Sequence, residues 1–147
     1  MTTDEDELQQ CADAIFGAAA ALAREFETAA RGLGLTKQQA VVLRTLDSPR
    51  AVGELAEQTG VDPSNLSSVV RRLDDAGLVT TTPDPSDRRA RIIRRTAAGT
   101  RTARKFEDAL RGSSVLGRLN ARERADLRAA LDQIAGGQHE RHAGPTA

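Results

Sequence analysis

At 147 residues the chain is long enough to bury one hydrophobic core, and its length gives no reason to expect a second domain. Apolar residues make up 39% of the chain and aromatic residues only 2%, so its core must come from aliphatic side chains and many alanines, which favour helices. The single cysteine excludes an intramolecular disulfide, the acidic N-terminus does not resemble a secretory signal, and the longest apolar run, residues 18–23, is too short to span a membrane. We therefore expect a mostly helical, cytoplasmic protein with no membrane partner and no cofactor.

The net charge of zero hides an uneven distribution along the chain. Residues 1–30 hold seven acids and one base, a net charge of −6, whereas residues 86–105 hold eight bases and one acid, a net charge of +7. A compact basic segment of this kind is typical of an element that binds a polyanion.

Apolar periodicity and capping patterns predict six helices. The capping box of Thr36 and Gln39 opens the second helix, and Asp62 followed by Pro63 opens the fourth. Thr96 caps the fifth helix and Asn120, with a glutamate three residues later, opens the sixth. The expected ranges, in chain order, are about 5–30, 36–46, 53–59, 63–76, 97–111 and 121–136, followed by a flexible tail over 137–147.

After Gly77 the helical period gives way to β-branched residues. Residues 78–82 and 90–94 are typical of two strands, and the turn-rich segment 83–87 between them contains two prolines. This pattern predicts a two-stranded hairpin with a long tip.

Two short helices and a hairpin, in this order, predict a winged helix-turn-helix between Val52 and Thr96. Leu55 and Ala56 should pack inward, and Gly60 stands where the turn favours a positive φ. The next helix carries an apolar stripe at i, i+3, i+4 and i+7, made by Leu66, Val69, Val70 and Leu73.

The opposite face of that helix carries small polar and basic residues, which suit the major groove of double-stranded DNA. Serine and asparagine can reach base edges, and arginines can reach phosphates. A solvated helix face with no ligand is the alternative interpretation. The candidate recognition residues are Ser64, Asn65, Ser67, Ser68, Arg71 and Arg72.

The hairpin tip is the most specific feature of the sequence. We expect Asp87 to hold an arginine by a charge-assisted hydrogen bond, and Arg88 and Arg89 to enter the minor groove, whose negative potential favours guanidinium groups. Arg91 is a candidate phosphate contact. The alternative is a solvated charged loop.

Taken together, these residues resemble the MarR family of bacterial transcriptional regulators. The resemblance covers residues 35–99 well, and it rests on the motif residues Glu54-Leu55-Ala56, Gly60-Val61, Leu66-Ser67, Val70, Leu73, Gly77-Leu78-Val79, Asp84-Pro85, Asp87-Arg88-Arg89, Arg95-Thr96 and Gly99.

The resemblance implies a homodimer that acts, most often as a repressor, on a pseudo-palindromic operator with half-sites about one helical turn apart. It further implies dimerisation through residues 1–34 and 100–136, a winged helix-turn-helix at 35–99, release of DNA by a small ligand, and no enzymatic activity.

Two positions depart from the family pattern. Thr80-Thr81-Thr82 stands where a basic residue usually follows Gly-Leu-Val, which removes one phosphate contact. Arg95 stands where the family usually has leucine, and this swap either turns Arg95 toward DNA or loosens the base of the hairpin.

Three further residues suggest other chemistry. Cys11 invites comparison with peroxide-sensing members of the family, but the chain has no tyrosine to support a thiolate, so a small core or interface residue is the favoured role. His139 and His142 lack a third metal ligand nearby. The alternatives to a DNA-binding regulator are therefore a winged-helix protein-interaction module and a redox-sensing regulator based on Cys11.

Overall fold

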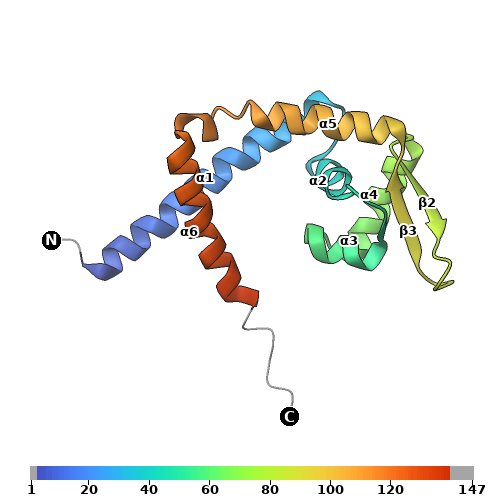
Figure 1. Ribbon diagram of the computed structural model, residues 1–147, viewed down its shortest axis with the longest axis horizontal. Helices are drawn as coiled ribbons and strands as arrows, with labels where there is room; N and C mark the ends of the chain where they lie inside the picture. The colour runs from blue at the N-terminus through green and yellow to red at the C-terminus, as the bar shows by residue number, and fades with distance from the viewer. Residues whose placement is uncertain (1–2, 140–147) are drawn as a thin grey trace, which may run out of the picture. The chain divides into compact units, whose positions relative to one another are not determined.

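The computed structural model describes residues 3–139, which contain all six predicted helices, a short 3-10 helix and a three-stranded antiparallel sheet (Figure 1). They divide between Gly112 and Ser113 into two compact units. The first unit contains α1 (Asp4–Gly32), α2 (Lys37–Thr45), β1 (Arg50–Ala51), α3 (Val52–Thr59), α4 (Pro63–Asp75), β2 (Val79–Pro83), β3 (Arg91–Arg95) and α5 (Ala97–Arg111). The second contains the 3-10 helix Leu116–Arg118 and α6 (Ala121–His139).

The predicted caps open the helices at the expected residues. At the start of α2 the Thr36 hydroxyl accepts a hydrogen bond from the Gln39 backbone N–H at 3.2 Å, and the Gln39 side chain accepts one from the Thr36 N–H at 2.8 Å. Asn120 and Glu123 make the same reciprocal pair before α6. Each box satisfies two backbone donors that a helix start leaves unpaired, which confirms these boundaries.

The core of the first unit is built around α2, which contacts α1, α3, α4 and α5. Leu43 of α2 is 1% exposed, and the rings of Phe26 and Phe106 meet edge to face with centroids 4.6 Å apart. The ring contact joins α1, which precedes the winged part, to α5, which follows it, and both helices also pack against α2. The remaining fully buried larger side chains are Leu46, Leu55, Leu66, Leu73, Ile93, Val42 and Val79.

The sheet confirms the predicted hairpin and adds one strand to it. β2 and β3 pair antiparallel from Val79↔Arg95 to Pro83↔Arg91, and β1 pairs with the other edge of β3 through Arg50↔Ile93. The sequence did not predict β1, because a strand of two residues shows no alternation that a sequence pattern can reveal.

α6 ends later than the sequence predicts. The helix continues through Gly136 and reaches His139, so the expected tail begins at least three residues too early. Glycine costs about 1 kcal/mol relative to alanine inside a helix but does not block its hydrogen bonds, as proline would. Residues 140–147, with His142, lie outside the described part of the chain.

Apolar side chains stay uncovered in each unit of the single chain. In α1, Leu8 is 66% and Phe16 is 74% exposed; in α6, Leu131 is 40% and Ile134 is 56% exposed. Among the described residues, no helix combines the length and apolarity that a membrane span needs.

Candidate DNA-binding surface

The turn between α3 and α4 has the geometry that the sequence predicts. Gly60 adopts φ 65°, a left-handed conformation that favours glycine, and its N–H donates to the Ala56 carbonyl at 3.0 Å. Leu55 is fully buried, while Ala56 and Val61 are partly buried against the core. This packing fixes how α4 crosses α3.

The apolar stripe of α4 faces the core, with Leu66 and Leu73 at 0%, Val69 at 5% and Val70 at 7% exposure. The opposite face therefore points to solvent. Five of the six candidate recognition residues are exposed there, and only Ser68 is half-buried at the edge of the face. The exposed five are Ser64, Asn65, Ser67, Arg71 and Arg72.

The N-terminus of α4 is capped by Asp62, as predicted. Its carboxylate accepts hydrogen bonds from both the hydroxyl and the backbone N–H of Ser64, the latter at 2.9 Å. These bonds hold the pKa of the Asp62 carboxyl below its ordinary value. The Ser64 hydroxyl proton is thus directed at Asp62, which leaves the hydroxyl oxygen as an acceptor toward solvent.

Asn65 is held by a residue that no sequence motif points to. Its Nδ2 donates to Oε1 of Gln38, at the start of α2, at 3.1 Å. Nothing in the local pattern marks Gln38, because the contact depends on how α2 packs against α4. Gln38 therefore joins the candidate site as the partner of Asn65.

The wing tip is ordered by aspartates bonded to nearby groups. Asp84 accepts from the backbone N–H and hydroxyl of Ser86 at 2.8 and 2.7 Å, and these bonds lower the pKa of the Asp84 carboxyl. Asp87 accepts from the backbone N–H of Arg89 at 2.9 Å. The expectation that Asp87 holds a guanidinium was wrong, because an aspartate in a tight turn reaches the N–H two residues on with little loss of side-chain entropy.

This arrangement leaves the arginine heads of the wing exposed. Within residues 3–139 no ion pair involves Arg88, Arg89 or Arg91, and the same holds for Arg71 and Arg72 of α4. The described surface of α4 and the wing therefore presents guanidinium groups with no carboxylate bound to them.

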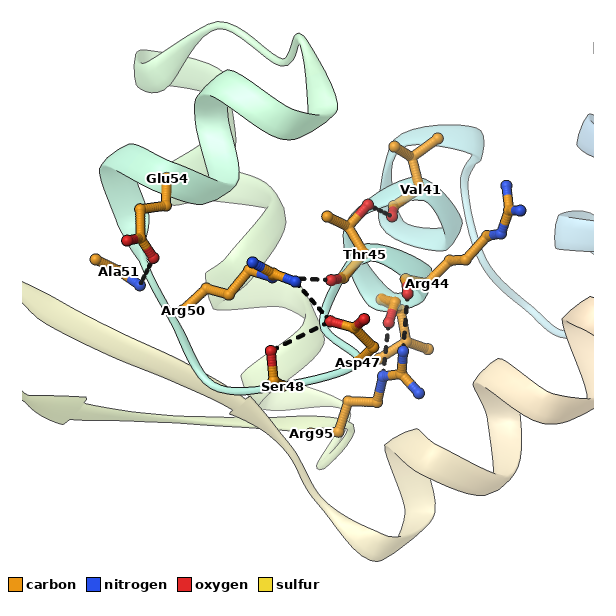
Figure 2. A network of polar contacts seen from close by, with 10 residues as sticks. Val41, Arg44, Thr45, Asp47, Ser48, Arg50, Ala51, Glu54 and Arg95 are labelled. Atoms are coloured by element: carbon orange, nitrogen blue, oxygen red, sulfur yellow. Dashed lines mark hydrogen bonds and ion pairs between the residues drawn. The ribbon is translucent and has the colours of Figure 1, made fainter. Parts of the chain in front are cut away.

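Arg95 follows neither of the two expectations for it. Its guanidinium points away from the wing surface and donates to two backbone carbonyls at the end of α2 (Figure 2). The base of the hairpin is thus fastened and not loosened, and this arginine is not part of the exposed basic set.

Cys11 is exposed on α1, so a core role is wrong for the single chain, and an interface role stays a prediction. Among the described residues, no cluster of three or more histidine, cysteine or acidic side chains could hold a metal ion.

The helix-turn-helix, the following hairpin and the short strand that completes the sheet define a winged helix-turn-helix protein. A model of the MarR family matches residues 33–90. The HTH-type transcriptional repressor Rv2887 of Mycobacterium tuberculosis is 31% identical over 124 residues, which cover 82% of this chain and 89% of that protein. The chain belongs to the MarR family of transcriptional regulators.

Solved structures agree with this assignment. The crystal structure of Rv2887 in complex with DNA has a TM-score of 0.69 at 31% identity, covering 84% of this chain and 95% of that one. AbsC, a MarR family regulator from Streptomyces coelicolor, has a TM-score of 0.78 at 25% identity, covering 95% and 98%.

Proposed function

We propose that this MarR-family regulator is a repressor that binds double-stranded DNA in a sequence-specific way through α4 and the β2–β3 wing. The observation that carries the proposal is the exposed surface of these elements, where arginines without ion pairs lie beside small polar side chains. Such a surface supplies phosphate contacts and base-edge contacts together. The related Rv2887 is named a repressor and was crystallised with DNA, which supports the same role here.

The roles within this surface follow from chemistry and position. Ser64, Asn65, Ser67 and Ser68 meet base edges in the major groove, where serine and asparagine read donors and acceptors. Arg71 and Arg72, a turn later, bind phosphates. On the wing, Arg88 and Arg89 enter the minor groove, Arg91 binds phosphate, and Asp87 shapes the turn that carries them.

The distribution of apolar side chains argues against a protein-interaction module. The exposed large hydrophobic residues of the described chain lie on α1, the 3-10 helix and α6, and α4 and the wing contribute none. A protein-binding face would expose apolar or aromatic anchors, whereas a DNA-binding face is polar and basic.

The same distribution supports homodimerisation through the helices outside the winged part. The apolar side chains of α1 and α6 would be buried by a second copy of the chain. A two-fold dimer presents two recognition helices, so the operator is pseudo-palindromic with half-sites about one helical turn apart.

Release by a small ligand is supported by an open pocket of about 370 Å³ on the surface of the first unit. It is lined by Arg44 of α2 and by Glu107, Leu110 and Arg111 of α5. Arg111 is paired with Asp108 at 2.6 Å, so Arg44, which has no ion pair among the described residues, is the cationic group that would bind a small aromatic carboxylate beside Leu110. Benzoate should weaken DNA binding by the wild-type protein more than by an Arg44→Gln variant, and an equal effect on both would remove this pocket from the proposal.

The wing tests the DNA-binding proposal. Arg88→Ala and Arg89→Ala should each weaken binding to a duplex at low salt, and the slope of log K against log salt should flatten by about one unit for each phosphate that is no longer bound. Arg31→Ala, which removes an exposed arginine of α1 paired with Glu27, is the matched control and should bind as the wild type does. A wild-type protein that does not bind DNA even at low salt would favour the protein-interaction alternative.

A further inference from the structure

Two arginines from neighbouring strands converge on the C-terminal end of α2 (Figure 2). Nε of Arg95, at the end of β3, donates to the Leu43 carbonyl at 2.8 Å, and its Nη2 donates to the Arg44 carbonyl at 2.8 Å. Nε of Arg50, in β1, donates to the Thr45 carbonyl at 3.2 Å. We call Arg50 and Arg95 the α2 clamp.

The clamp completes the hydrogen bonding of the helix end. The last four carbonyls of a helix have no partner within it. In α2 the first of these four, on Val42, accepts from the Leu46 N–H at 3.2 Å, and the clamp serves the other three. Cationic groups at a helix C-terminus are also favoured by the helix dipole. A neutral or shorter side chain at either position would leave carbonyls unpaired.

The two halves of the clamp are held differently. Nη2 of Arg50 also pairs with the Asp47 carboxylate at 2.7 Å, which lowers the pKa of that carboxyl. Arg95 has no ion pair among the described residues, and its two strong contacts are the α2 carbonyls. Burial lowers the pKa of the Arg95 guanidinium, and the charges of Glu107 and Asp47 partly oppose this effect. Arg95 is thus a half-buried cation whose position is set by the carbonyls of the helix end.

Arg95 also stands where the wing meets the body of the winged domain. The next residue, Thr96, donates from its hydroxyl to the Gly77 carbonyl at 2.7 Å and caps α5 by accepting from the Gly99 N–H at 3.0 Å. The root of β3 is therefore tied to α2, to the turn after α4 and to α5. Since a strand rises about 3.3 Å per residue, β3 from Arg91 to Arg95 spans roughly 13 Å, and the turn that carries Arg88 and Arg89 lies beyond its far end. A small tilt at the root becomes a large displacement at the tip.

We propose that Arg95 is a positioning residue for DNA binding: by fastening β3 to the end of α2, it sets where the wing arginines stand relative to the recognition helix. This inference rests on the proposed function and adds a residue whose guanidinium does not touch DNA. Its effect is transmitted through β3 to Arg88 and Arg89. Removing the Arg95 side chain therefore weakens the contacts that the wing arginines make, although Arg95 itself contacts no phosphate.

A double-mutant cycle tests this role. On a duplex selected by the wild-type protein, Arg95→Gln should weaken binding about tenfold. Any flattening of the salt slope should be smaller in the Arg88→Ala background, because Arg95 itself contacts no phosphate. Arg88→Ala should then cost a smaller factor in the Arg95→Gln background than in the wild type, because Arg88 on a displaced wing contributes less to binding. Arg95→Lys should recover only part of the affinity, since an ammonium group cannot fork to two carbonyls.

Arg94→Gln is the matched control. It removes the same charge one residue earlier from an exposed side chain on the other face of β3, and Arg88→Ala should cost the same factor there as in the wild type. Thermal melts check that each variant is folded. If Arg95→Gln does not fold, Arg95→Lys replaces it in the double-mutant cycle. The proposal would be overturned if Arg88→Ala weakened binding by the same factor with and without Arg95. It would also be overturned if Arg95→Lys restored the full affinity and the salt slope depended only on the charge at position 95. Absence of DNA binding by the wild type would instead overturn the proposed function.

Discussion

The side chain of Asn65 donates a hydrogen bond to Gln38 at 3.1 Å, and this contact joins the first turn of α4 to the first turn of α2. An amide held by one N–H presents its oxygen and its second N–H in a fixed orientation. Gln38→Ala should free the amide and reduce discrimination at the base pair that Asn65 reads, by less than the roughly 1–3 kcal/mol that a full bidentate base contact is worth. Affinities for duplexes altered at one base pair at a time measure this reduction.

Gln38→Glu separates orientation from charge. Glutamate keeps an acceptor for Asn65, so the order of preferred bases should stay the same, while the added negative charge near phosphates lowers every affinity. If Gln38→Ala discriminates as sharply as the wild type does, Gln38 does not position Asn65.

Gly99 is required by a close approach at the start of α5. A Cβ on this residue would lie 1.9 Å from the carbonyl oxygen of Leu78, so the backbone would have to move. Gly99→Ala should lower the free energy of unfolding by about 1–3 kcal/mol or more, as overpacked cores do. Chemical denaturation measures the change.

Gly53→Ala is the control for the same substitution in open space. Gly53 lies in α3, and nothing comes within 4 Å of a Cβ built there. Alanine should leave stability unchanged or raise it by up to about 1 kcal/mol, because it favours the helix. Equal decreases in stability at both glycines would show that the Leu78 contact is not the cause.

The cap of α4 makes stability depend on pH in the acid range. Hydrogen bonds from Ser64 lower the folded-state pKa of Asp62 from its ordinary 3.8, so the unfolded chain takes up this proton at a higher pH than the folded chain does. The contribution of the cap is complete above the ordinary pKa and is lost as the pH falls through the folded-state pKa.

Asp62→Asn should uncouple the cap from pH. Asparagine keeps the acceptor oxygen and caps helices about as well as aspartate, so stability near neutral pH should change little. The decline of Tm as the pH falls below about 4 should become shallower than in the wild type, because one coupled proton is gone. An unchanged decline would mean that the cap does not titrate as described.

The sequence predicted the helices well because their signals are local. Thr36, Asp62, Thr96 and Asn120 each bond to a group two or three residues away, so the pattern alone carries the contact. The burial of the α4 stripe was predictable for the same reason, since one helical period decides it.

Features that the sequence did not predict depend on contacts between distant segments. β1 is defined only by its pairing with β3, and Gln38 becomes relevant only when α2 packs against α4. Arg95 looked like an exposed member of the basic segment, because charge counts do not reveal a helix end with unpaired carbonyls. For Asp87 we expected a bond from an arginine side chain, but its carboxylate accepts from the backbone N–H of Arg89, two residues away.

The proposed dimer makes a prediction for α6. Leu127, Leu131 and Ile134 lie on one side of the helix and are 38–56% exposed in the single chain. Leu131→Glu should convert a dimer into a monomer at micromolar concentration, because a buried carboxylate without a partner is costly. Sedimentation velocity measures the change.

The matched control is Ala129→Glu, on the opposite side of α6 and exposed. This variant should remain a dimer. A monomeric wild-type protein, or a Leu131→Glu variant that dimerises as the wild type does, would contradict dimerisation through this face.

Selection of bound duplexes from a random DNA pool tests the proposed sequence-specific DNA binding most directly. We expect one enriched sequence with two-fold pseudo-symmetry and half-sites about one helical turn apart, and an altered preference when Ser64 or Asn65 is substituted. A pool that remains random after repeated selection, or an enriched sequence unaffected by substitutions in both α4 and the wing, would contradict it.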